Sequence, residues 1–265
     1  MTTPGFEYKN KKNETPFETF LRYTNEKEQS AVKLATVLQK KLRNAASILD
    51  IGTGNGEYLK LVLLNTSSHI ADKTKLTLLE PSSDLSAQLK NQFANLTPQA
   101  SVEVVSSDLQ AFDSDEKFDI ILMSHLFYHL PRPAWSALLI KTLLLLKKDG
   151  VLIIVLRERD DAYSFKMAFK PLLFDSTFQA FTIDDVLAAL PKDQVLHIDR
   201  QTASSELDIP IEKSLEDTIS IIEFYLNKEW DDIPHNIQES SLDFIKKRNG
   251  IFKQLDGIAL ITVTD

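Results

Sequence analysis

The segment SILDIGTGNG, residues 47–56, places three glycines at alternate positions directly after a short apolar run. They are Gly52, Gly54 and Gly56, three of only seven glycines in the chain. Glycine has no Cβ and adopts positive φ readily, so such a turn lets the backbone approach a ligand closely. In an open α/β sheet, ligands bind beyond the carboxyl ends of the strands. The segment therefore predicts a ligand-binding turn after a buried strand. The alternative is a tight strand–helix turn without a ligand.

Strands and helices alternate on both sides of this turn. Short apolar runs predict strands, and segments with apolar residues every three or four positions predict helices. The predicted strands are 47–52, 75–80, 101–108, 118–125, 151–157, 194–201 and 257–263. The predicted helices are 17–43, 57–65, 82–96 and 132–148, the last ended by Asp149-Gly150. This alternation favours an α/β fold with a doubly wound, mostly parallel seven-stranded sheet and right-handed crossovers.

The helical segments outside this alternation predict additions to the sheet domain. We expect an N-terminal helical cap over residues 1–45 and a domain over 46–265 that contains the sheet. Residues 159–193 and 210–250 are expected to be helical additions on the side where a substrate binds, the second inserted before the last strand.

Composition excludes several classes of function. The chain has 265 residues, a net charge of −8 and no cysteine. The absence of cysteine removes disulfides, thiolate metal sites and cysteine nucleophiles, and we expect no metal. The acidic charge disfavours a nucleic-acid partner. No apolar run reaches the roughly 18 residues that a membrane helix needs, and the N-terminus lacks the apolar region of a signal peptide, so we expect a cytoplasmic protein.

The spacing of the glycines distinguishes between ligands. A dinucleotide-binding turn needs a glycine at position 57, where this chain has Glu57. The sequence DIGTGNG instead resembles motif I of the Class I S-adenosylmethionine-dependent methyltransferases, which have a Rossmann-like fold. The strand ends LTLLE and VVSSD, the segment FDIILMSHLFYHLP and the turn LKKDGVLIIV match this family in order.

This resemblance implies S-adenosylmethionine as the cofactor. Glu80 is expected to accept hydrogen bonds from the ribose hydroxyls, and Asp108 to lie near the adenine amino group. The alternatives are a solvated strand-end glutamate and a helix cap. The implied cofactor-binding residues are Asp50, Gly52, Thr53, Gly54, Gly56, Glu80, Pro81, Ser82, Ser107, Asp108, Leu109, Ser124 and His125.

A closer resemblance extends beyond the sheet. The segments FETFLRYTNEKEQ, HLFYHLP, FTIDDVLAAL and DGIALITV are similar to the histamine N-methyltransferase family. The resemblance implies aromatic contacts to the substrate and polar groups that face its amine. Phe20 and Tyr23 are the implied aromatic residues, and Glu28, placed to within one or two positions, His125, His129 and Asp256 are the implied amine-facing residues.

This sequence departs from the family at three of these positions. His125 and Asp256 replace amides and His129 replaces a tyrosine, which favours a polar pocket for a cation without specifying histamine. His129 is the candidate catalytic residue, since histidine can take a proton from an amine. Tyr128 and Tyr163 are further candidates for binding a cation. The alternatives are histidines packed on the sheet edge, tyrosines in the core and a solvated turn residue at 256.

The function that these residues predict is methylation of a small molecule, most simply on an amine or imidazole nitrogen. Two alternatives stay open. Arg132 and Arg157 are compatible with an O-methyltransferase that acts on a small carboxylate or hydroxyl. The chain is also compatible with an S-adenosylmethionine-binding protein without catalysis, whose long helical excursion binds a partner.

Overall fold

A computed structural model describes residues 14–42, 45, 47–66, 74–93, 101–174, 178 and 180–264. The chain forms two compact units. The unit that we call the sheet unit comprises Ser30–Leu156, Ile183–Ala203 and Gly257–Asp265. The unit that we call the helical unit comprises Met1–Gln29, Arg157–Thr182 and Ser204–Asp256. This division differs from the predicted domain boundary at residue 46, because the sheet unit begins at Ser30.

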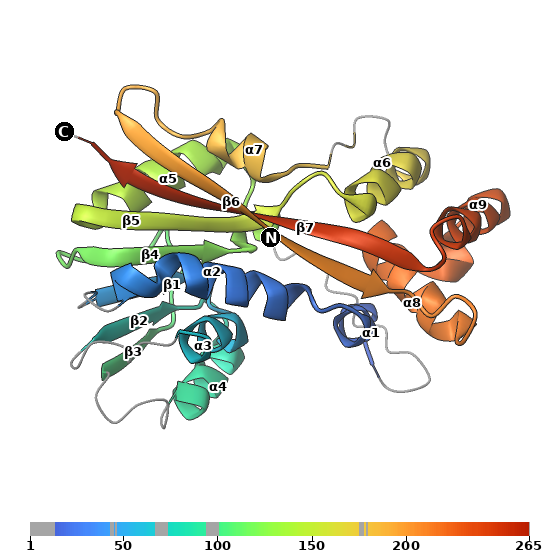
Figure 1. The fold of residues 1–265 in the computed structure, drawn as a ribbon, viewed down its shortest axis with the longest axis horizontal. Coiled ribbons are helices and arrows are strands. Elements are labelled where there is room, and N and C mark those ends of the chain that lie inside the picture. The colour runs from blue at the N-terminus through green and yellow to red at the C-terminus, as the bar shows by residue number, and fades with distance from the viewer. Residues whose placement is uncertain are drawn as a thin grey trace. The chain divides into compact units, whose positions relative to one another are not determined.

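The sheet has seven strands in the order β3-β2-β1-β4-β5-β7-β6, as Figure 1 shows. The strands are β1 (Ser47–Ile51), β2 (Lys75–Leu79), β3 (Ser101–Val105), β4 (Phe118–Ser124), β5 (Leu146–Arg157), β6 (Leu196–Asp208) and β7 (Ile251–Val263). β1 to β5 pair in parallel. β6 and β7 run antiparallel, since Thr264 N–H donates to Val195 O at one end and Ile209 N–H donates to Gly250 O at the other. The predicted fold class is confirmed.

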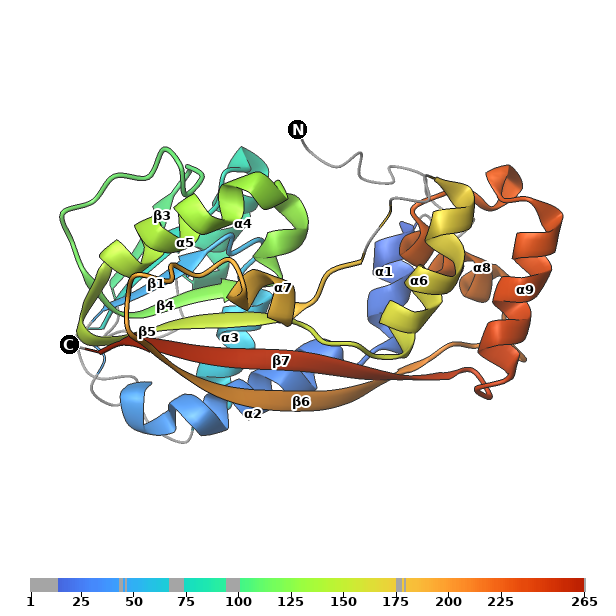
Figure 2. The ribbon, with the colours of Figure 1, turned by 90° about the horizontal axis from the view of Figure 1, so that it is seen from above.

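Helices cover both faces of the sheet unit. They are α2 (Glu26–Leu42), α3 (Glu57–Leu64), α4 (Ser83–Phe93), α5 (Trp135–Leu144) and α7 (Ile183–Leu187), with short 3₁₀ turns η1 (Leu126–His129) and η2 (Arg132–Ala134). Alternate residues of a strand face opposite sides of the sheet, and Leu76 and Leu78 of β2 share one core with α2, α3 and α4. Figure 2 shows α2 and α5 on opposite faces.

The predicted helix 17–43 is wrong in one respect, because two helices replace it. α1 (Pro16–Tyr23) begins with a capping box in which Thr15 and Glu18 exchange hydrogen bonds. The chain then becomes extended at Thr24, which bridges Leu207 of β6, and Asn25 N–H donates to Glu206 O. Pairing with a distant strand therefore interrupts an otherwise helical pattern. Residue 43 lies outside the described residues.

Three other predicted elements have different bounds. The helix expected to reach residue 148 ends at Leu144, and β5 starts at Leu146, with an irregular pairing against β4. Asp149 has a φ of +64°, which no α-helix accommodates. β6 and β7 extend well beyond the predicted 194–201 and 257–263. The predicted helix 82–96 is described only to Phe93, as α4.

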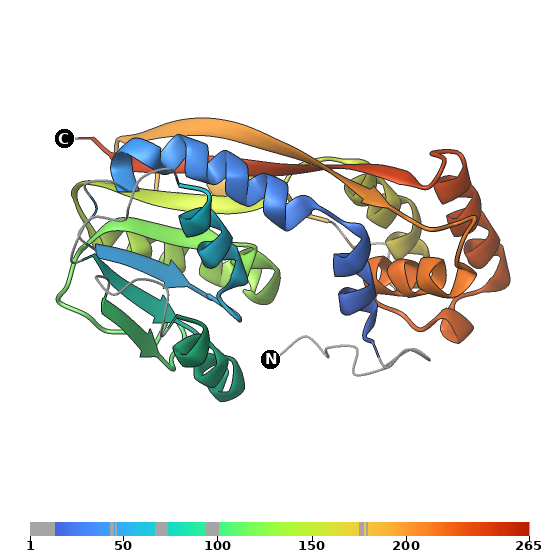
Figure 3. The same ribbon diagram turned by 60° about the horizontal axis from the view of Figure 1, so that its bottom comes forward.

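The helical unit has its own core of aromatic and aliphatic side chains. Its helices are α1, α6 (Asp161–Leu173), α8 (Leu215–Leu226) and α9 (His235–Lys246), with the 3₁₀ turn η3 (Trp230–Asp232). Figure 3 shows α1 beside α8. Phe165 packs against Phe169, Tyr225 and Phe252, all of them buried. Within the described residues, no helix combines the length and the apolar character that crossing a bilayer requires.

Candidate functional site

The three alternate glycines form the turn between β1 and α3. All three have positive φ: +70° at Gly52, +60° at Gly54 and +81° at Gly56. A Cβ at Gly52 would lie 2.6 Å from Leu126 Cδ1, and one at Gly56 would lie 2.4 Å from the ring of Phe93. A Cβ at Gly54 would have no protein atom within 4 Å. Close packing against neighbouring side chains therefore requires glycine at positions 52 and 56. Gly54 instead faces open space, where a ligand can approach the backbone.

These surroundings predict different outcomes for alanine at the second and third glycines. Gly56→Ala is expected to destabilise the fold by about 1–3 kcal/mol, because backbone strain adds to a clash with Phe93. Gly54→Ala is expected to retain most of the stability but to weaken binding of S-adenosylhomocysteine, the demethylated cofactor, about tenfold. Thermal unfolding of both variants, with and without this ligand, measures both effects. Wild-type affinity in Gly54→Ala would contradict the assignment of this turn to the cofactor.

Glu80 follows β2 and joins two backbone segments. Its side chain is only 7% exposed, which excludes the solvated strand-end alternative. Oε2 accepts the Gly54 N–H at 2.9 Å, and Oε1 accepts the Ser82 N–H at 2.9 Å. A carboxylate oxygen has two lone pairs, so each oxygen can accept a further hydrogen bond. The carboxylate is thus oriented beside the open Gly54, and the two residues fit the ribose of an adenosyl group.

Asp50 lies in β1, one position before the strand ends. It is 4% exposed, and burial raises the pKa of its carboxyl to about 7, with a smaller contribution from the charge of Glu80 and an opposing hydrogen bond from Thr53. The Thr53 hydroxyl also donates to the Asp50 carbonyl at 2.9 Å. Asp50 and Thr53 therefore support the glycine turn from inside the sheet unit.

The predicted adenine-binding residues follow β3. Leu109 is buried, while Asp108 is exposed and accepts the Ala111 N–H at 2.8 Å through Oδ1. No helix follows Asp108, so the helix-cap alternative is not realised; its Oδ1 holds a turn instead, and its second carboxylate oxygen leaves the proposed adenine role possible. Ser107 is half-buried beside it, and Pro81 is exposed after β2.

The loop after β4 carries the two histidines. His125 has a φ of +51°, and its N–H donates to Val155 O at 2.9 Å. Its ring stacks on Tyr128, with ring centroids 6.1 Å apart. His129 ends η1 and is exposed, and Ser124 closes β4 half-buried. The left-handed backbone conformation of His125 ends β4. Both histidines therefore lie on the loop that follows β4, at the carboxyl edge of the sheet.

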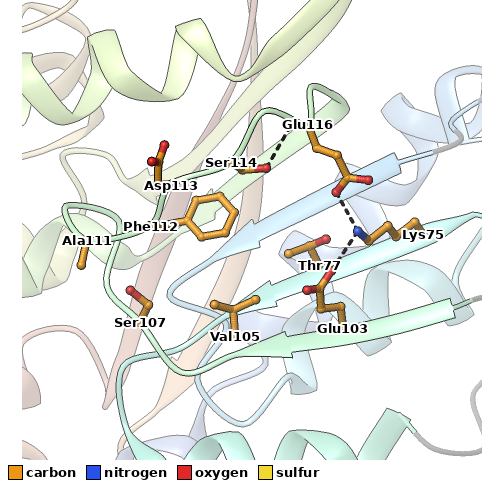
Figure 4. Close-up of a pocket in the computed structure, with 10 residues that line it drawn as sticks. All are labelled: Lys75, Thr77, Glu103, Val105, Ser107, Ala111, Phe112, Asp113, Ser114 and Glu116. Carbon is orange, nitrogen blue, oxygen red and sulfur yellow. Dashed lines mark hydrogen bonds and ion pairs between the residues drawn. The ribbon is translucent and has the colours of Figure 1, made fainter.

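A cavity of about 400 Å³ lies elsewhere in the sheet unit, against β2 and β3 (Figure 4). The crossover from β3 to β4, residues 106–117, contains no helix that could cover this face of the sheet. Polar side chains of β2, β3 and the crossover line the cavity there. Lys75 Nζ lies 2.8 Å from Glu103 and 2.6 Å from Glu116. Among the described residues that line this cavity, only Ser107 is also a predicted cofactor residue. The cavity is therefore a half-solvated sheet face, distinct from the glycine turn.

The aromatic candidates of the helical unit are held in different ways. Phe20 is 4% exposed and stacks on Phe224, with centroids 4.5 Å apart, which fits the core-packing alternative. Tyr23 donates its hydroxyl hydrogen bond to Asp217 at 2.7 Å, and burial, followed by Asp217, raises the pKa of its phenol. Tyr163 is partly exposed and lies under the guanidinium of Arg159, 5.7 Å from the ring centroid.

The acidic candidates of the helical unit have opposite environments. Glu28 is exposed on α2, and two positions earlier Glu26 is buried and paired with Arg157. Asp256 is 2% exposed, which excludes the solvated-turn alternative. Since the predicted position of Glu28 carries an offset of one or two residues, the structure favours Glu26 as the buried carboxylate of this segment.

Arg157 is the centre of a buried ionic cluster that sequence reasoning did not find. Its guanidinium donates to Asp160, three positions away, at 2.9 Å and to Glu26, which is 131 positions away. Asp160 also accepts the Tyr163 N–H at 2.7 Å and so caps α6. The charges of Glu26, Tyr225, Asp256 and Asp160 outweigh desolvation and raise the pKa of Arg157. The one signal in the sequence was a charged residue that ends the apolar run VLIIVLR.

Comparison with known proteins gives one family match. A family model described as a methyltransferase domain matches residues 21–204. Among solved structures, the YcgJ protein from Bacillus subtilis is 14% identical, with 88% of this chain and 99% of that chain covered and a TM-score of 0.55. Coclaurine N-methyltransferase bound to N-methylheliamine and S-adenosylhomocysteine is 16% identical, with 87% of this chain and 72% of that chain covered and a TM-score of 0.50. The N-methyltransferase NodS from Bradyrhizobium japonicum WM9 is 14% identical, with 68% of this chain and 88% of that chain covered and a TM-score of 0.47. No curated protein sequence matches the chain.

Proposed function

The chain belongs to the methyltransferase domain family and uses S-adenosylmethionine, and on this basis we propose that it methylates a nitrogen of a small cationic molecule, an amine or an imidazole compound. One observation carries the choice of acceptor. The buried cluster of the helical unit contains three carboxylates, Glu26, Asp160 and Asp256, against two cationic side chains, the guanidinium of Arg157 and the amine of Lys166, whose pKa burial lowers to about 7. An excess of buried negative charge attracts a cation and repels an anion. The sequence resemblance to the histamine N-methyltransferase family supports the same acceptor class.

The cofactor supplies an electrophilic methyl group when it is bound. We propose that Gly54 and Glu80 hold its adenosyl moiety, with Asp108 and Leu109 on the adenine side. Methyl transfer is then governed by positioning of the acceptor and exclusion of water.

The acceptor nitrogen needs a free lone pair, so a protonated amine must first lose a proton. His129 stands exposed on η1, and a neutral imidazole nitrogen can accept a proton from an amine. We assign this role to His129, which follows the stacked pair His125 and Tyr128 on the same loop.

The O-methyltransferase alternative loses support from the ionic pairing of Arg157. An arginine that anchors a substrate carboxylate has to offer donors, whereas Arg157 already donates to Glu26 and Asp160. Arg132 is exposed and lies over the ring of Trp135 at 5.6 Å. The acceptor carboxylate would thus meet mainly negative charge in the helical unit.

Asp256→Asn tests the proposed acceptor class. The variant is expected to raise KM for an accepted amine about tenfold with little change in kcat, because uniform binding of the cation is lost. Methyl transfer from labelled S-adenosylmethionine to a panel of amines, imidazoles and carboxylic acids identifies the acceptor. Asp243→Asn, an exposed change on α9, is the matched control. Activity confined to carboxylic acids, or an unchanged KM in Asp256→Asn, would refute the proposal.

A further inference from the structure

The cavity against β2 and β3 takes no part in the proposed reaction (Figure 4). It lies within the sheet unit, and its volume of about 400 Å³ is in the range of small-molecule sites. The apolar residues Val105, Ala111 and Phe112 belong to its lining, and Phe112 is buried. The cavity is therefore large enough for a compact organic molecule and offers an apolar wall to its body.

Thr77 of β2 contributes a buried hydroxyl group to this lining. The residue is 2% exposed, and its Oγ1 has no hydrogen-bond partner among the described residues. Residues two positions apart in a strand face the same side of a sheet, so Thr77 points to the side of β2 that carries Lys75, as Figure 4 shows. A hydroxyl that is buried without a partner costs free energy, and a ligand with a hydrogen-bonding group would remove that cost.

The charged residues of the cavity favour a cation. Lys75 Nζ lies 2.8 Å from Glu103 Oε2 and 2.6 Å from Glu116 Oε2, so two carboxylates share one ammonium. The Oε1 atom of each carboxylate can accept a hydrogen bond from a ligand. Thr77 is the register partner of Glu103, which places the buried hydroxyl beside one of these carboxylates. Within the described lining, no three acidic or histidine side chains lie close enough to hold a metal ion, so an organic cation fits better.

We propose that this cavity is a second ligand site, which binds a small organic amine. The ammonium group of the amine donates to Thr77 Oγ1 and to the carboxylates of Glu103 and Glu116. Its apolar body packs against Phe112 and Val105. All of these residues belong to the sheet unit, so the site is separate from the acidic cluster of the helical unit and does not depend on the proposed function.

Benzylamine is the probe for this site, and benzyl alcohol, which carries no charge, is the control ligand. Calorimetry at neutral pH gives the dissociation constants for the wild-type protein and for Thr77→Val, which removes the hydroxyl but keeps the shape of the side chain. The variant is expected to bind benzylamine about tenfold more weakly, because a hydrogen bond from a charged donor is lost. The double variant Glu103→Gln/Glu116→Gln is expected to bind about fivefold more weakly, since both carboxylates are exposed.

Two controls separate this site from other effects. Thr36→Val, which removes an exposed hydroxyl of α2, is expected to bind benzylamine like the wild type. Methyl NMR locates the bound amine, because the signals of Val105 and Ala111 are expected to shift in the wild type and much less in Thr77→Val.

The melting temperature without ligand distinguishes a binding hydroxyl from a structural one. Thr77→Val is expected to melt no lower than the wild type, since it loses a hydroxyl that has no partner. A lower melting temperature with unchanged benzylamine affinity would show that the hydroxyl is structural. The inference also fails if benzyl alcohol binds as tightly as benzylamine, or if benzylamine leaves the signals of Val105 and Ala111 unchanged. None of these outcomes alters the proposed function.

Discussion

Glu80→Ala is expected to weaken binding of S-adenosylhomocysteine by at least about tenfold. Charge-assisted hydrogen bonds to a carboxylate contribute about 1.5–3 kcal/mol each, and the ribose would lose two of them. The variant also leaves the N–H groups of Gly54 and Ser82 without the acceptor that fixes the turn. Calorimetry measures the affinity, and the ligand-induced rise in melting temperature gives a second readout.

The controls for this variant separate charge from shape. Glu80→Gln keeps an oxygen acceptor but loses the charge, so its affinity is expected to lie between those of the wild type and Glu80→Ala. Glu103→Gln, an exposed change on the neighbouring strand β3, is expected to bind normally. NAD is expected not to bind any of these proteins. An unchanged dissociation constant in Glu80→Ala would remove this residue from the cofactor site.

Arg157→Met is expected to lower the free energy of unfolding by about 3–5 kcal/mol. Removing one partner of a buried ion pair leaves an uncompensated charge, and here two carboxylates, Glu26 and Asp160, lose the cation that pairs with them, although Asp160 keeps the N–H groups of Tyr163 and Leu255. Chemical denaturation of the full chain measures the loss, and the melting temperature is expected to fall with it.

A second variant tests whether the buried charge causes this loss. The double variant Glu26→Leu/Arg157→Met removes one of the stranded carboxylates, so it is expected to be more stable than Arg157→Met alone. Arg157→Lys keeps the charge but not the two-sided geometry of the guanidinium, and an intermediate stability is expected. A loss below about 1 kcal/mol in Arg157→Met would show that the pair contributes no more than a surface salt bridge does.

Local sequence was sufficient to determine the central sheet and the cofactor turn. Each strand from β1 to β4 is a short run rich in apolar residues and β5 contains one at residues 151–157, so periodicity and the right-handed rule leave few topologies. The glycine turn was equally local, since Gly54 and its neighbours are adjacent in sequence. Glu80 was predicted because its distance along the chain from Gly52 fits one strand-and-helix unit. The methyltransferase class and its cofactor followed from the resemblance of these segments to a known family, and both are confirmed by the family match.

Tertiary structure alone decided the features that depend on distant residues. The break at Thr24 arises because the chain pairs there with Leu207, which overrides a continuous helical pattern. Arg157 and Glu26 pair across 131 positions, and nothing within either segment indicates the other. The choice between Glu26 and Glu28 likewise depends on which side of α2 is covered. Helical periodicity fixes which residues share a face, but the burial of a face is fixed by what packs against it.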